Sequence, residues 1–249
     1  MIQRGFWKKA HYLNKMSFSE LVVAYFQHYT IQVYLIGSAL LLFWAFSQGG
    51  DPIRFILSAG LVVLVYPLAW YLLHRFVLHG QWLFKSRFTA KLWKRIHFDH
   101  HQNPHHLEVL FGALYTTLPT IAIISIPIGF VLGGPAVAAV AFATGMLTTC
   151  FYEFCHCVQH LSYKPRNRFL AGMKSRHMEH HFFDEKGNFG ITNFFWDYLF
   201  STYYVREECS ERSVTVFNLG YTYEVAERYP WVLELTGGVI LENPRQSTK

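Results

Sequence analysis

The chain contains four long apolar segments separated by polar or glycine-rich strings. A helix needs about 20 mostly apolar residues to cross a hydrocarbon core of roughly 30 Å. The segments that approach this length are residues 30–46, 53–73, 115–132 and 136–154. Each is predicted to form a membrane-spanning helix.

Two short turn-forming strings join these segments in pairs. Residues 47–52 read Ser-Gln-Gly-Gly-Asp-Pro and residues 133–135 read Gly-Gly-Pro, and both are too short to hold a domain. Each pair is therefore expected to form a helical hairpin, with bends at Pro67, Pro119 and Pro127. The predicted fold is all-α, with four transmembrane helices in two hairpins and a cytosolic helical cap.

The composition supports a membrane protein with one main domain. Of the 249 residues, 52% are hydrophobic and 15% are charged, against about 25% charged residues in soluble proteins. We expect an N-terminal cytosolic or interfacial segment at 1–29, a membrane domain carrying the histidines at 30–205, and a cytosolic C-terminal tail at 206–249. The sequence does not indicate what the tail does.

Lysine and arginine flank the apolar segments on one predicted side. They lie before the first segment, between the second and third, and after the fourth; the first set is Arg4, Lys8, Lys9 and Lys15, whereas the hairpin tips carry only Asp51 and Arg54. Because cytoplasmic loops carry the excess of basic residues, both termini and the histidine groups are predicted to be cytosolic. The prediction is a multi-pass protein of a bacterial inner membrane or the endoplasmic reticulum.

Ten of the fourteen histidines fall into four compact groups. These are His74 and His79; His97, His100 and His101; His156 and His160; and His177, His180 and His181. Residues three and four apart share a face of a helix, so each of the last three groups can present its rings to one centre. On a regular helix His74 and His79 would lie about 140° apart, so they either bind different ions or need a local distortion.

The histidine groups predict a dinuclear metal centre. An imidazole buried without partners costs on the order of 1–3 kcal/mol, whereas ligation satisfies one nitrogen of every ring. Ten nitrogens exceed what one ion accepts, and imidazole suits iron and zinc. Of the remaining histidines, His11 and His28 are expected to be interfacial, and His105 and His106 to lie in a turn or to contact a ligating ring from outside.

Several acidic and thiol side chains lie near the histidines in sequence: Asp99, Glu153, Glu179, Asp184, Cys155 and Cys157. Carboxylates commonly orient ligating imidazoles, but Asp99 and Glu179 are expected to point away from the metal, so a solvated role stays open. The cysteines, with Cys150 and Cys209, form no CxxC pair and are interpreted as reduced packing residues.

The four groups resemble those of the fatty acid hydroxylase superfamily, which includes sterol desaturases. The likeness covers about residues 71–202 and is greatest to the fatty acid 2-hydroxylase branch. It rests on the four residues between His74 and His79, on Gly-Asn-Phe-Gly-Ile-Thr at 187–192 and on Trp-Asp-Tyr-Leu-Phe-Ser-Thr at 196–202. Sterol desaturases usually have three residues between the first two histidines, so the spacing favours hydroxylases and also resembles carotenoid hydroxylases.

The resemblance implies a ligand set and a chemistry. All ten grouped histidines would bind metal, divided as His74, His97, His100, His156 and His177 on one ion and His79, His101, His160, His180 and His181 on the other. Two iron ions would activate O2, zinc being able to occupy the same positions. The implied catalytic group is the dinuclear centre itself, with no separate catalytic side chain.

The implied function is that of a non-haem di-iron monooxygenase that hydroxylates a lipid acyl chain. The sequence contains neither GxGxxG nor His-Pro-Gly-Gly, so electrons are expected from another protein, of cytochrome b5 or ferredoxin type. No nucleic-acid partner is expected, and the oligomeric state, the exact lipid and the carbon attacked stay open. One alternative is a sterol or carotenoid desaturase or hydroxylase. A more distant one is a membrane zinc-binding or transport protein. The near absence of ionisable residues within the spans counts against transport.

Overall fold

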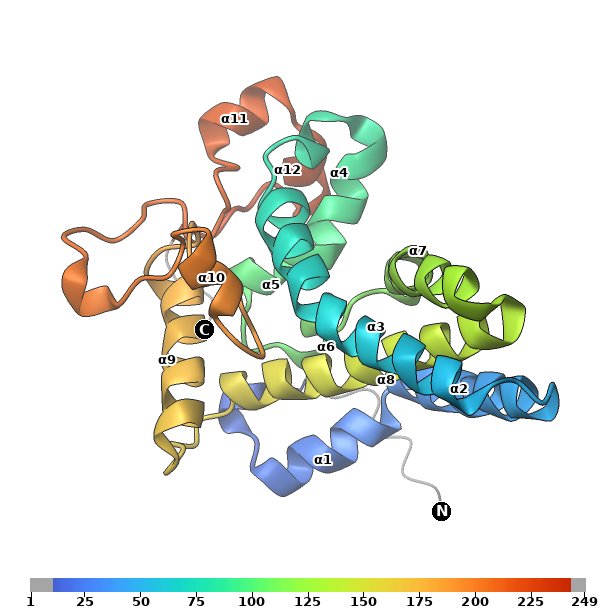
Figure 1. Cartoon of the computed structure of the whole chain (residues 1–249). Helices are drawn as coiled ribbons and strands as arrows, with labels where there is room; N and C mark the ends of the chain where they lie inside the picture. The colour runs from blue at the N-terminus through green and yellow to red at the C-terminus, as the bar shows by residue number, and fades with distance from the viewer. Residues whose placement is uncertain (1–10, 243–249) are drawn as a thin grey trace, which may run out of the picture. The chain divides into compact units, whose positions relative to one another are not determined.

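The computed structural model describes residues 11–242, and these residues are mostly helical (Figure 1). They form two compact units, one made of 11–18, 71–111 and 157–242 and the other of 19–70 and 112–156. The predicted basic residues Arg4, Lys8 and Lys9 lie outside the described part of the chain.

The second unit contains the apolar helices. They are α2 (Tyr29–Ser47), α3 (Pro52–Leu72), α7 (Leu114–Gly133) and α8 (Pro135–His160), preceded by α1 (Phe18–Gln27). All four apolar helices are long and apolar enough to cross a membrane, so the prediction of four spans is confirmed. The largest difference from the predicted bounds is in α8, which continues to His160 and carries His156 and His160 in its last turns.

The tips of the two hairpins pack together within this unit. Ala45, Phe55 and Val140 are buried in a shared apolar cluster, and the Phe55 ring contacts Phe46 edge-on at 5.3 Å. Gly134 ends α7 with a φ of 78°, a conformation that glycine adopts without strain. The short strings between the apolar segments therefore make the predicted hairpins.

Large apolar side chains cover the outside of these helices. Phe43 is 76% exposed, Leu64 73% and Val131 85%. Such extensive apolar surface is unfavourable in water and is expected where lipid surrounds a helix. Pro67 lies inside α3 and Pro119 and Pro127 inside α7, and both helices continue past them; bends there stay a prediction.

The first unit consists of short helices and connecting segments. In chain order they are η1 (Leu13–Lys15), η2 (Leu73–Leu78), η3 (Leu83–Lys85), α4 (Arg87–Trp93), η4 (Lys94–Phe98), α5 (Asp99–Gln102), α6 (Leu107–Leu110), α9 (Arg168–Phe182), α10 (Phe195–Leu199), η5 (Arg206–Glu208), α11 (Tyr223–Arg228) and α12 (Trp231–Leu235). Among them η2 and η4 are π-helices. Nine of the ten grouped histidines belong to this unit.

An apolar core in the first unit joins the central segment to the C-terminal segment. Trp93 is fully buried against Phe84 and Phe98, with ring centroids at 5.0 and 5.1 Å, and the C-terminal residues Leu219, Tyr221, Ala226, Val232 and Ile240 complete the cluster. The Gln102 amide also donates to the carbonyl of Phe217 at 2.8 Å. The C-terminal segment, whose role the sequence left open, therefore packs directly behind the second histidine group.

Candidate metal centre

The first histidine pair lies on a π-helix. In this helix type the hydrogen bonds join residues five apart, and the amide of His79 donates to the carbonyl of His74 at 3.0 Å. The two rings consequently lie on the same side, with centroids 4.9 Å apart. The sequence left two possibilities for this pair, binding to different ions or a local distortion of the helix. The described backbone has the distortion.

The ligand nitrogens of the grouped histidines gather in two main sets. Within each set they lie within 4.8 Å of one another. The first set, called here the His74 set, consists of His74, His79, His97 and His180; the second, the His100 set, consists of His100, His160, His177 and His181, with His156 one turn before His160 on α8. His101 forms a further group with His180 and His181.

This grouping differs from the division of ligands implied by the resemblance, and that division stays a prediction. That division assigned His74 and His79 to different ions, but they share a set because the π-helix brings their rings together. It also separated His160 from His177, whose Nε2 atoms are 2.9 Å apart.

The nitrogen separations fit bound metal ions. His79 Nε2 and His97 Nε2 are 2.8 Å apart, close to the 2.9 Å between the His160 and His177 nitrogens. Two nitrogens bound to one ion at about 2.1 Å and at a right angle would lie about 3 Å apart. In addition, His74 Nε2 is buried and has no hydrogen-bond partner among the described residues. These rings therefore fit a pair of metal ions.

Backbone carbonyls orient three of the rings. The Nδ1 atoms of His74, His180 and His101 lie 2.7, 2.7 and 2.9 Å from the carbonyl oxygens of Phe189, Gly187 and Val216 respectively. Each ring can donate through Nδ1 and present Nε2 to an ion, an arrangement that fixes the tautomer of a metal-binding histidine. The sequence alone gave no sign of these acceptors, because any residue carries a carbonyl.

Burial lowers the pKa of several of the grouped imidazoles. It lowers the pKa of His97 well below 6.5, and the neighbouring His79 and His101 rings lower it further. Burial likewise lowers the pKa of His181, and the His101 and His100 rings add to the effect. Neutral imidazole is the form that binds metal, so the pocket is prepared for ligation at neutral pH.

The metal-free protein is expected to lose stability as the pH falls below about 6.5. Histidines of the unfolded chain take up protons near that pH, whereas in the folded chain the pKa values of His97 and His181 are lower. The unfolded state therefore holds more protons in this range, and acid favours it. Thermal unfolding in detergent at about pH 7.5 and 5 measures the effect; a midpoint that does not move would contradict it.

The carboxylates near the histidines bind other partners. Asp99 forms an ion pair with Lys94 at 2.6 Å, and the Asp184 carboxylate accepts from the amide of Lys186 at 3.0 Å. Both therefore point elsewhere, as predicted for Asp99. Glu153 is buried in the second unit.

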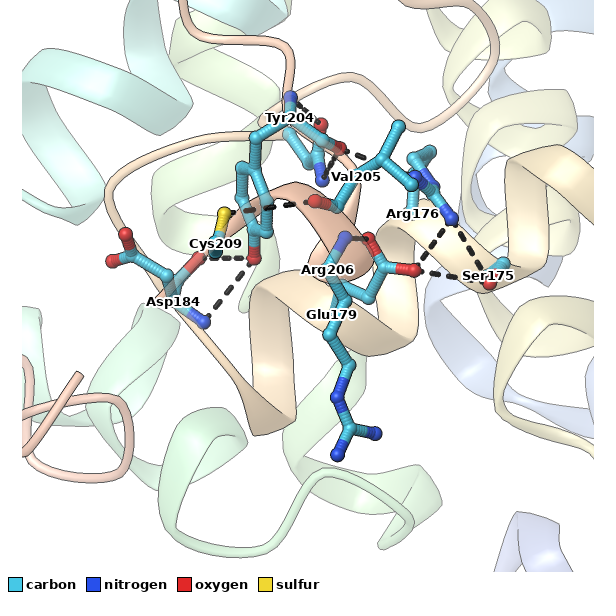
Figure 2. A network of polar contacts seen from close by, with 9 residues as sticks. Ser175, Arg176, Glu179, Asp184, Tyr204, Val205, Arg206 and Cys209 are labelled. Carbon is cyan, nitrogen blue, oxygen red and sulfur yellow. Dashed lines mark hydrogen bonds and ion pairs between the residues drawn. The ribbon is translucent and has the colours of Figure 1, made fainter. Parts of the chain in front are cut away.

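Glu179 belongs to a network that ties α9 to the following segment (Figure 2). Its carboxylate lies 2.6 Å from the guanidinium of Arg176 and accepts from the Ser175 hydroxyl at 3.1 Å and from the amide of Arg206 at 3.2 Å. Burial raises the pKa of Glu179, and Arg176 opposes this rise. Glu179 thus binds partners other than the grouped histidines, as expected, but it is buried and ties α9 to the following segment.

The remaining histidines and the cysteines lie outside the two sets. His28 is buried and caps α2, its Nδ1 accepting from the amide of Thr30 at 3.3 Å, and is therefore not the interfacial side chain that we expected. The His105 ring stacks on Phe182 and lies 5.7 Å from the His160 ring, so it lies beside a ring of the His100 set without belonging to that set. His106 packs on Tyr12. All four cysteines are free thiols, as predicted.

Comparison with known proteins identifies the family. The family model for fatty acid hydroxylases matches residues 59–202. Fatty acid 2-hydroxylase of Rattus norvegicus is 31% identical over 140 residues, 56% of this chain and 37% of that protein. Dihydroceramide fatty acyl 2-hydroxylase FAH1 of Arabidopsis thaliana is 33% identical over 136 residues, 53% of this chain and 54% of that protein. The match thus spans only about a third to a half of these relatives.

A solved structure supports the same fold. It is full-length scs7p with only the hydroxylase domain visible, and it matches with a TM-score of 0.58 and 24% identity over 81% of this chain and 71% of that one. The family model covers more than half of the chain, and all ten grouped histidines lie inside the matched range. The chain therefore belongs to the fatty acid hydroxylase family.

Proposed function

We propose that this protein hydroxylates the acyl chain of a membrane lipid at two iron ions. The ligands would be the ten grouped histidines: His74, His79, His97, His100, His101, His156, His160, His177, His180 and His181. The observation that carries the proposal is the gathering of imidazoles, most of them buried, into two sets whose ring nitrogens lie within 4.8 Å of one another. Zinc would fit the same nitrogens, so a zinc-loaded sample would not decide the working metal.

The proposed metal supplies what side chains cannot. Breaking an unactivated C–H bond requires redox chemistry, which bound iron provides together with O2. In the overall reaction one oxygen atom enters the C–H bond and the other leaves as water. This balance requires two electrons and two protons, which we assign to a separate electron-transfer protein of cytochrome b5 or ferredoxin type.

The chain itself would position the ions and exclude water. Carbonyls of Gly187 and Phe189 orient His180 and His74. The Phe189 ring, 4% exposed, lies edge-on to the rings of His74 and His79 at 5.5 and 5.3 Å. It thereby shields one side of the His74 set from solvent.

The names of the relatives suggest where to look for the product. Two are called fatty acid 2-hydroxylase and dihydroceramide fatty acyl 2-hydroxylase. A further relative, from Saccharomyces cerevisiae, is named ceramide very long chain fatty acid hydroxylase SCS7. We propose a free or amide-linked fatty acyl chain as the substrate and carbon 2 as the position attacked. The lipid would come from the bilayer around the four apolar helices, with the histidine sets on the cytosolic side.

Lipid analysis under isotopic oxygen tests the proposal. The full chain is expressed in cells without endogenous 2-hydroxylated lipids, and the cells are grown under 18O2. We expect a hydroxylated acyl product that carries one 18O atom. Unlabelled product, or none from protein carrying iron, would refute the proposal. A desaturated or hydroxylated sterol or carotenoid would instead assign the centre to the alternative substrates.

A further inference from the structure

A short loop between α9 and α10 holds two ligands of the His74 set. This Gly187–Gly190 loop has the sequence Gly-Asn-Phe-Gly. Its carbonyls at Gly187 and Phe189 lie 2.7 Å from the Nδ1 atoms of His180 and His74. The position of this loop therefore determines the orientation of two of the four rings in that set.

Asp197 on α10 anchors the loop from behind. Its side chain is fully buried; one carboxylate oxygen accepts from the amide of Phe189 at 2.8 Å and the other from the amide of Gly190 at 2.9 Å. The Thr202 hydroxyl donates a third hydrogen bond at 2.9 Å. Burial raises the pKa of Asp197, and these three donors oppose the rise. The surroundings of the carboxylate therefore supply hydrogen-bond donors to it.

The remainder of the loop leaves little freedom. A side chain at Gly190 would collide with the carbonyl of Asn193 and with the Asp197 carboxylate. Asn188 adopts a φ of 55°, and its amide group exchanges hydrogen bonds of 3.0 and 3.1 Å with the backbone of Tyr204. The carboxylate therefore faces the loop in one defined arrangement.

The carboxylate and a histidine meet at opposite sides of one peptide group. The amide nitrogen of Gly190 and the carbonyl oxygen of Phe189 belong to the same planar unit. Asp197 accepts from the nitrogen side, and the oxygen side faces His74. A carboxylate that binds the N–H polarises the peptide and strengthens its carbonyl as an acceptor, which makes the imidazole a better metal ligand.

From this geometry we infer that Asp197 is a positioning residue for the metal ion bound by the His74 set, acting through the Phe189–Gly190 peptide group. The inference rests on the proposed function, because it requires that the histidines bind metal. It gives the motif residue Asp197 a role that is specific to one of the two ions. The His100 set does not depend on these hydrogen bonds.

Asp197→Asn is expected to weaken one metal position selectively. Asparagine has the same shape, but its amide NH2 would face one of the two backbone N–H groups, and the charge is lost. Removing such an outer partner typically lowers metal affinity by about 10- to 100-fold. We expect that loss at the His74 set and no more than a small change at the His100 set.

Cobalt release from the purified full-length protein measures this. The protein is loaded with Co2+ alone, and release into a competing chelator is followed by absorption. His79→Ala removes a ligand of the His74 set and His177→Ala one of the His100 set, so these variants assign the two release steps. Asp184→Asn is the matched control, because the Asp184 carboxylate accepts from the Lys186 amide and from no other donor in residues 11–242.

The outcomes separate this inference from the proposed function. A selective shift of the step assigned to the His74 set, absent in Asp184→Asn, supports it. Equal weakening of both cobalt-release steps would overturn the inference, because Asp197 would then have only a general structural role. Unchanged release steps in Asp197→Asn would also overturn the inference. Both results would leave the proposed function intact. Wild-type protein that binds no Co2+ through these histidines would refute the proposed function and, with it, the role of Asp197.

Discussion

Replacing His100 by alanine is expected to remove one bound metal ion and to abolish the hydroxylated product. His100 is 2% exposed, and its ring centroid lies 4.5 Å from that of His181 and 5.1 Å from that of His160. Loss of a ligand should exceed the roughly 10- to 100-fold that removal of an outer partner costs in affinity or activity. Metal analysis of the purified variant and lipid mass spectrometry of the expressing cells measure the two effects.

His106→Ala is the matched control for this prediction. His106 lies in the same unit, but its ring packs on Tyr12 and belongs to neither set. It should keep both metal ions and the product. A His100→Ala variant that folds and still yields wild-type product would remove hydroxylation at this centre from consideration.

Trp93→Ala is expected to lower the free energy of unfolding by about 3–5 kcal/mol, the usual cost of emptying a large aromatic site in a core. Trp93 is 0% exposed, and its indole N–H donates to the carbonyl of Leu78 at 2.9 Å. The variant therefore loses packing between α4 and the C-terminal segment and also removes the indole donor to the partly buried carbonyl of Leu78. Denaturant unfolding in detergent, monitored by circular dichroism, measures the change.

Phe88→Ala is the comparison on the same helix. Phe88 is 94% exposed, so its removal should change stability by no more than about 0.5 kcal/mol. Similar losses in both variants would show that the core around Trp93 does not hold the first unit together. Because Leu78 directly precedes His79, a loosened core should also weaken metal binding.

The sequence predicted the features that depend on composition and short-range spacing. Four apolar runs of sufficient length and two turn strings were enough to place α2, α3, α7 and α8. The pairing of His177 with His180 and His181 followed from helical periodicity. Such features are local, so neighbours in sequence determine them.

The remaining features depend on contacts between distant segments. The carbonyl of Val216 lies 115 residues from the ring of His101 that it orients, and no pattern in the sequence indicates that contact. The sequence indicates Asp197 only as part of the Trp-Asp-Tyr-Leu-Phe-Ser-Thr motif at 196–202, because the role of this residue depends on a loop whose path the sequence does not determine. The placement of His74 and His79 on one side stayed open for a related reason: an ideal α-helix cannot represent the π-helix around His74.

The π-helix at Leu73–Leu78 also bears on how spacer lengths between the first two histidines should be interpreted. Deleting one residue there would return the segment to ordinary α-helix with the histidines four positions apart, again on one face. A three-residue and a four-residue spacer can thus encode the same ring arrangement in two backbone forms. Spacers of three and four residues between these histidines are consequently compatible with the same centre, and the difference between them is by itself weak evidence about which lipid a homologue oxidises.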